Sequence, residues 1–159
     1  MPGRTRTATP RSARSAALHL LGRRDYTSTE LRRALARRGY DEAEIDRVLT
    51  DLGTAGLVDD RRAGAAHVRV AAGAKGRGRL RIERELEARG IDRSLAKDLT
   101  RTVTADDERA AIERILAAKR LPRRLGPADH RRVFQHLLRR GFPPDAIARV
   151  LRSRVNDES

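Results

Sequence analysis

A short pattern of arginine, glycine and an apolar residue occurs three times in this chain and limits the folds open to it. Its glycines are Gly39, Gly90 and Gly141, and successive glycines are 51 residues apart. Apolar residues stand eight and four positions before each glycine and nine positions after it: Leu31, Leu35 and Val48; Ile82, Leu86 and Leu99; Val133, Leu137 and Val150. Several columns that agree at one period are the signature of a tandem repeat.

The spacing of these columns predicts helices. Residues four apart lie on one face of a helix, because a turn contains about 3.6 residues. Each glycine then stands where a helix can end in the left-handed conformation that glycine adopts easily. Asp41 and Asp92 follow the first two glycines and are placed to cap the next helix. In the third repeat Pro144 suits a first helical turn.

A further helix precedes each of these pairs, at about residues 12–21, 60–72 and 106–119. In the first of them Ala17, Leu18 and Leu21 form the expected buried face, and Asp59 is the expected N-cap of the second. Thr27 and Glu30 have the spacing of a capping box. The connections before the middle helices of the second and third repeats, including residues 73–78, are basic and are expected to be exposed loops.

The fold class expected is therefore all-α: three tandem three-helix repeats in an elongated curved array. Three small helices bury little apolar area, so neighbouring repeats must share interfaces. The expected division is a disordered basic arm at 1–11, repeats at 12–58, 59–103 and 104–153, and a flexible tail at 154–159.

Charge alternates with the same period. The formal net charge is +14, and aromatic residues make up 3% of the chain, which argues against a binder that stacks bases on an aromatic platform. Residues 15–40, 61–90 and 119–140 carry net charges of +4, +6 and +7, whereas residues 41–60 carry −6. The middle helices are therefore basic, and aligned in a stack they would form a stripe suited to an elongated polyanion. The alternative is a set of solvated faces with local Glu–Arg pairs.

The chain shows no pattern typical of an enzyme. It has no cysteine, and none of its four histidines forms a zinc motif. The glycines around Lys75 lack the spacing of a phosphate-binding loop. The acidic runs at 59–60 and 106–108 stand at helix starts, where acids complement the helix dipole. We therefore expect no enzyme, cofactor, metal or membrane span, and the polar start of the chain favours a cytoplasmic protein.

Several motifs follow one another along the chain: residues 17–24 (ALHLLGRR), 29–35 (TELRRAL), 56–62 (GLVDDRR), 78–86 (GRLRIEREL) and 89–92 (RGID), followed by Arg140-Gly141-Phe142. In this order they resemble the RecX family of recombination regulators. The likeness covers about residues 13–152. Ala63 and His67 stand at positions where the family usually has aromatic residues.

The resemblance implies a regulator that binds the RecA recombinase, usually as its filament on single-stranded DNA. It implies inhibition of filament growth, strand exchange and the RecA ATPase, and hence modulation of recombinational DNA repair and the SOS response. Weak direct contact with DNA and a monomeric state are also expected. The candidate contacts to RecA or DNA come from the basic middle helices: Arg32, Arg33, Arg77, Arg79, Arg81, Arg84, Arg131, Arg132 and Arg139.

Two other functions fit the sequence. The chain could be a stand-alone helical nucleic-acid-binding protein, since its middle helices are basic. It could also be a basic scaffold that links other proteins. A filament regulator should gain affinity when RecA coats the strand, whereas a stand-alone DNA binder should not, and a scaffold should need neither.

Overall fold

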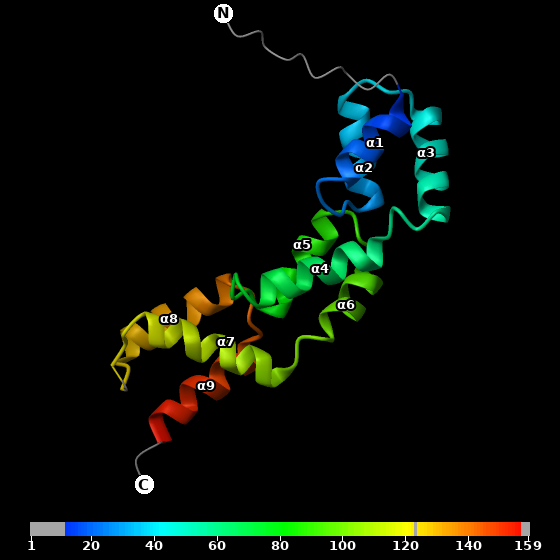
Figure 1. The fold of residues 1–159 in the computed structure, drawn as a ribbon. Coiled ribbons are helices and arrows are strands. Elements are labelled where there is room, and N and C mark those ends of the chain that lie inside the picture. Colours follow the sequence, from blue (N-terminus) through cyan, green and yellow to red (C-terminus); the bar gives the residue numbers. More distant parts are fainter. Residues whose placement is uncertain (1–11, 123, 157–159) are drawn as a thin grey trace, which may run out of the picture. The chain divides into compact units, whose positions relative to one another are not determined.

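The computed structural model describes residues 12–122 and 124–156, and these form nine helices and no strand (Figure 1). The helices are α1 (Ala13–Leu21), α2 (Ser28–Arg37), α3 (Glu42–Thr54), α4 (Asp60–Ala72), α5 (Arg79–Ala88), α6 (Arg93–Thr100), α7 (Ala105–Ala118), α8 (Pro127–Arg139) and α9 (Pro144–Asn156). The prediction of an all-α repeat fold is confirmed. The arm expected at residues 1–11 lies outside the described residues. So does the end of the expected tail, while residues 154–156 continue α9.

The three repeat glycines end the middle helices as the spacing predicts. Gly39, Gly90 and Gly141 have φ angles of 85°, 85° and 89°, in the left-handed region. In each repeat the residue after the glycine donates its N–H to a carbonyl near the helix end; the acceptors are Leu35, Leu86 and Leu137. This is the Schellman arrangement, which satisfies carbonyls that the end of a helix would leave unpaired.

The predicted caps at the helix starts are present. The Asp41 side chain accepts from the N–H of Ala43, and that of Asp92 accepts from the N–H groups of Ser94 and Leu95. Thr27 and Glu30 form the expected capping box on α2. At the start of α4, the Asp59 carboxylate accepts from the N–H of Arg62 at 3.0 Å.

The chain divides into two compact units, residues 1–63 and 64–159. The core of the first unit combines α1, α2, α3 and Val58. The prediction for α1 is wrong at Leu18, which is 41% exposed, and Leu21 is only partly buried. The buried face is instead made by Ala13, Ala16, Ala17 and Leu20, whose three- and four-residue spacing forms a single stripe.

The second unit contains two clusters of buried residues. One joins α4, α5 and α6 around Ile82, Leu86 and Leu99, and the other joins α7, α8 and α9 around Phe142 and Ile147. The second and third predicted repeats therefore each have a core of their own and pack within one unit.

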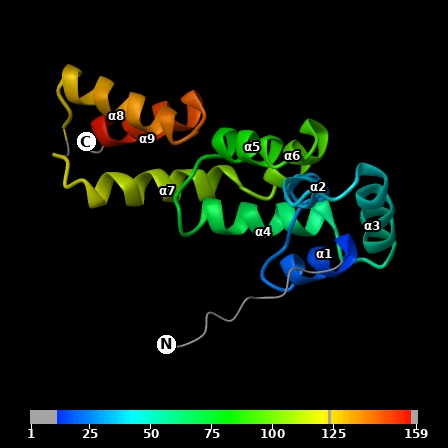
Figure 2. The ribbon, with the colours of Figure 1, turned by 90° about the horizontal axis from the view of Figure 1, so that it is seen from above.

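These two repeats meet where α8 ends and α5 begins (Figure 2). The N–H groups of Gly78 and Leu80 donate to the carbonyls of Arg140 and Gly141, at 2.8 and 3.0 Å. The backbones approach so closely that a Cβ on Gly78 would lie 2.3 Å from the Gly141 carbonyl carbon. A Cβ on Gly141 would lie 2.2 Å from the Cβ of Arg81. Only glycine fits at either position without a shift of backbone.

The loop before α5 is less exposed than the sequence suggests. The guanidinium of Arg140 donates to the carbonyls of Lys75 and Gly76, at 2.8 and 3.2 Å. Gly78 is buried, so the expectation of an exposed loop over residues 73–78 holds only for its first part, residues 73–75. The end of the loop is buried because the backbone of Gly78 bonds to the end of α8, where the second and third repeats meet.

Candidate functional site

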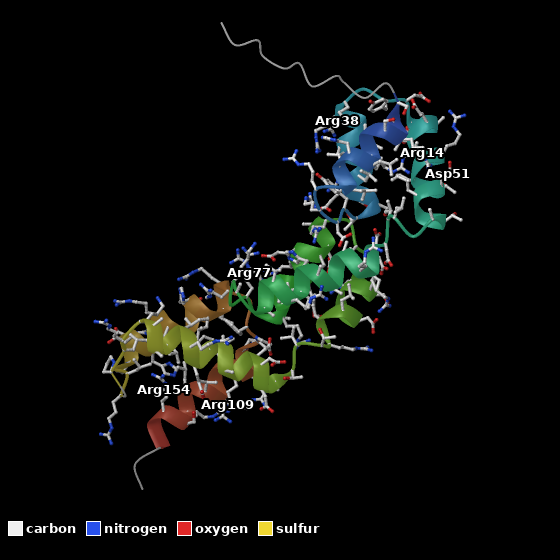
Figure 3. The ribbon with its side chains drawn as sticks, viewed as in Figure 1. Arg14, Arg38, Asp51, Arg77, Arg109 and Arg154 are labelled. Atoms are coloured by element: carbon white, nitrogen blue, oxygen red, sulfur yellow. The ribbon has the colours of Figure 1, made fainter. Side chains whose placement is uncertain are left out.

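The predicted arginines of the second repeat lie on or just before α5, and three of them are paired with acids of the same helix. Arg77, which is labelled in Figure 3, contacts Oε1 of Glu85 at 2.7 Å, and Arg81 contacts the same oxygen at 2.9 Å. Arg79 lies 3.6 Å from Glu83. Arg84 is exposed, and its Nε donates to the carbonyl of Leu80. Arg84 is therefore the α5 candidate whose charge no described carboxylate offsets.

Glu85 is the centre of this network. Besides the two arginines, Nε2 of His67 from α4 lies 2.9 Å from its Oε2. Burial raises the pKa of Glu85, but the hydrogen bonds from His67, Arg81 and Arg77 outweigh burial and leave the pKa below its usual value. Glu85 is thus ionised at neutral pH and neutralises part of the positive charge at the start of α5. His67 thus gives α4 a polar contact with α5 at a position where the resemblance noted in the sequence leads to the expectation of an aromatic residue.

The α8 arginines of the third repeat are less constrained. Arg132 lies 3.5 Å from Asp129, and its side chain is 80% exposed. Arg131 and Arg139 are exposed and have no acidic partner among the described residues. Exposed pairs of this length contribute little, about 0–1 kcal/mol. The face of α8 therefore presents more available positive charge than α5 does.

The α2 candidates belong to the first unit. Arg32 forms an ion pair with Asp46 of α3, and Arg33 is exposed. The structure thus brings the α5 and α8 candidates into one unit, where the two helices meet end to end, and leaves those of α2 in the other.

The acidic runs act at helix starts. The Asp60 carboxylate accepts from the N–H and the hydroxyl of Ser28, at 2.7 and 2.9 Å, and so caps α2 from α4. The Asp107 carboxylate accepts from the N–H and the hydroxyl of Thr104. Among the described residues no group of three or more His, Cys, Asp or Glu side chains is suited to hold a metal ion.

Glu108 has a role that sequence reasoning missed. It is 5% exposed, and its Oε1 accepts from the N–H of Arg79, the first residue of α5. Burial is the main effect on Glu108 and raises its pKa. Asp60 serves the first residue of α2 in the same way, so a carboxylate from the next repeat caps each of these two middle helices. The sequence does place acids at the starts of α4 and α7, but their long-range partners are not readable from local spacing.

Comparison with known proteins identifies the family. Residues 13–52 match the first three-helix domain of RecX, and residues 106–151 match its third three-helix domain. The regulatory protein RecX of Halorhodospira halophila is 36% identical over 146 residues, which cover 88% of this chain and 86% of that protein. The chain belongs to the RecX family. The regulatory protein RecX of Mycobacterium ulcerans is 32% identical, over 94% of this chain and 88% of that protein.

A solved structure shows the same fold. The crystal structure of RecX from Lactobacillus salivarius superposes with a TM-score of 0.79 at 21% sequence identity. The superposition covers 90% of this chain and 94% of that one. As a member of a family of regulatory proteins, the chain has a regulatory role. Among its described residues, no helix has the length and apolar character needed to cross a membrane.

Proposed function

We propose that this chain binds the RecA recombinase, chiefly as its filament on single-stranded DNA, and inhibits filament growth, strand exchange and the RecA ATPase. It would in this way modulate recombinational DNA repair and the SOS response. The observation that carries the proposal is its membership of the RecX family along nearly the whole chain. The protein would act as a monomer in the cytoplasm, without catalysis of its own.

The surface that supports this proposal is formed by the available arginines of the second unit. Arg84 on α5 and Arg131 and Arg139 on α8 are exposed and lack acidic partners among the described residues. Guanidinium groups at such positions can bind phosphate or carboxylate without first breaking an ion pair within the protein. We assign Arg77, Arg79 and Arg81 a smaller share of partner binding, because acids of α5 already hold them.

The test is a RecA ATPase and strand-exchange assay with the double variant Arg131→Glu, Arg139→Glu. Exposed substitutions usually change stability by less than about 0.5 kcal/mol, so the fold should remain intact. We expect inhibition to weaken by at least about tenfold, because reversed charges repel an acidic or phosphate-lined surface.

The matched control is Arg93→Glu, Lys97→Glu on α6, which changes the net charge equally at two exposed positions of the second unit. It should reduce inhibition by less than about twofold. An equal loss of inhibition in the two double variants would show that inhibition depends on net charge alone, and that α8 is not a contact face.

A comparison of binding to bare and to RecA-coated single-stranded DNA distinguishes this proposal from the alternative of a stand-alone nucleic-acid-binding protein. A stand-alone nucleic-acid-binding protein would bind both equally and leave the RecA ATPase unchanged. A regulator of the filament should bind the coated strand more tightly at the same salt concentration.

A further inference from the structure

A groove lies between the second and third repeats, between the C-terminal half of α4 and residues 107–114 of α7. Its volume is about 280 Å³, and all of its lining residues belong to the second unit. The apolar part of the lining is Val68, Ala72, Val103, Ala110, Ala111 and Phe142. An opening of this size and character accepts an apolar side chain.

The rim of the groove is positively charged. Arg69 of α4 and Arg114 of α7 line it from its two sides; both are exposed and have no acidic partner among the described residues. The two acids in the lining are already engaged. Asp107 accepts from Thr104, and Glu108 accepts from the N–H of Arg79. The lining holds three arginines, Arg69, Arg77 and Arg114, against these two acids, so its formal charge is positive by one.

We propose that this groove binds an extended segment of a partner protein in which an apolar side chain is flanked by carboxylates. The apolar side chain would fill the space between α4 and α7, and the carboxylates would pair with Arg69 and Arg114. An apolar centre with a charged rim is the usual anatomy of a protein–protein contact.

Nucleic acid fits this groove poorly. A phosphate backbone offers nothing apolar to fill the floor, and the lining has no accessible aromatic ring to serve as a stacking platform for bases. The only ring in the lining is Phe142, which is 1% exposed and belongs to the core of the third repeat. The groove and the α8 arginines thus suit two different chemistries of contact.

The first experiment titrates the full chain with a short synthetic peptide that has a central leucine between paired aspartates, followed by NMR. We expect amide shifts concentrated at Val103, Ala110 and Ala111. A peptide with serine in place of the leucine, and one with asparagine in place of the aspartates, should each bind at least about fivefold more weakly. Shifts spread over the basic surface, or equal binding of the three peptides, would overturn the proposal.

The variant Ala110→Glu tests the site within the protein. Ala110 is an exposed residue of α7, so the fold should tolerate the change, and the new carboxylate stands four residues before Arg114, where it can pair with it. Peptide affinity should fall by at least about tenfold. The matched control is Val70→Glu, which adds the same charge at a 51% exposed position of α4 outside the lining and should change affinity by less than about twofold. Equal effects of the two variants would overturn the proposal.

The segment could belong to the recombinase itself, and this extension rests on the proposed function. In that case Ala110→Glu should weaken inhibition of RecA while leaving affinity for bare single-stranded DNA unchanged. If the parent chain does not inhibit RecA, the proposed function fails, and the peptide titration still decides the groove. If the parent inhibits and Ala110→Glu inhibits equally, the proposed function stands and the recombinase is not the source of the segment.

Discussion

The middle helices of the second and third repeats, α5 and α8, stand at the same place in the repeat but use their arginines differently. On α5 the side chains of Glu83 and Glu85 hold three arginines from the helix and the residues before it. On α8 the only acid is Asp129, and Arg131 and Arg139 have no acidic partner among the described residues. Similar net charges in the sequence therefore correspond to different amounts of available charge.

The starts of the two helices also differ. The first N–H of α5 donates to the buried Glu108 of α7, which ties the second repeat to the third. The first residue of α8 is Pro127, which has no N–H to satisfy, and no side chain caps the helix. Other helices therefore bond to α5 through the Glu85 side chain and through the backbone N–H of Arg79. At the start of α8, by contrast, the stabilising feature is the proline of the helix itself.

The largest effect is expected at the junction where α8 ends and α5 begins. Gly141→Ala should destabilise the second unit by roughly 3 kcal/mol or more, since it adds a clash with Arg81 to the strain of a positive φ. Gly39 is the control, because its φ is nearly the same but a Cβ added there would have no atom within 4 Å beyond its chain neighbours. Gly39→Ala should cost about 1 kcal/mol.

Native-state hydrogen exchange is the suitable measurement, because the two glycines lie in different units. The loss should appear in the amides of α8 and α5 for the first variant and in those of α2 for the second. Equal losses in the two variants would show that backbone strain alone matters and that the close approach of α8 to α5 is easily relieved.

A smaller effect is expected from Glu85 and Glu108, which both bond to residues at the start of α5. The contributions of these two glutamates to stability change with pH in opposite directions. The lowered pKa of Glu85 means that its stabilisation is present above its unfolded pKa, near 4.5, and is lost as the pH falls through the folded value. Glu85→Gln should therefore cost about 1 kcal/mol at neutral pH and progressively less in acid.

The raised pKa of Glu108 means that its contribution is complete below 4.5 and is lost as the pH rises through the folded value. Glu108→Gln keeps an oxygen for the N–H of Arg79, and should gain stability relative to the parent across that same rise. Urea unfolding of both variants at several pH values checks the two signs. A stability difference for either variant that does not change with pH would contradict the assignment.

The sequence predicted local features well because their causes lie within a few residues. The glycine ends at Gly39, Gly90 and Gly141 and the capping box of Thr27 and Glu30 follow from the spacing of residues on one helix. The buried face of α1 was misjudged because Leu18 is larger and more apolar than the alanines that form the actual stripe.

Contacts between distant residues could not be predicted in this way. The spacing of Arg81 and Glu85 is that of an ion pair on one helix and was available in the sequence. The addition of His67 and Arg77 to that pair depends on how α4 packs against α5. The groove likewise exists only because the second and third repeats pack together. The candidate arginines were therefore identified as a group, whereas their separation into held and available members required the structure.

The smallest effect is expected at the start of α8. Pro127→Ala should lower stability by only about 0.5 kcal/mol, since proline at a first helical position acts mainly by restricting the unfolded chain. The new N–H would be exposed and could bond to water, so no buried group would be left unpaired. Pro144→Ala at the first residue of α9 is the matched control and should behave alike. A loss above about 1.5 kcal/mol for Pro127→Ala alone would mean that the stability of α8 depends strongly on its first turn.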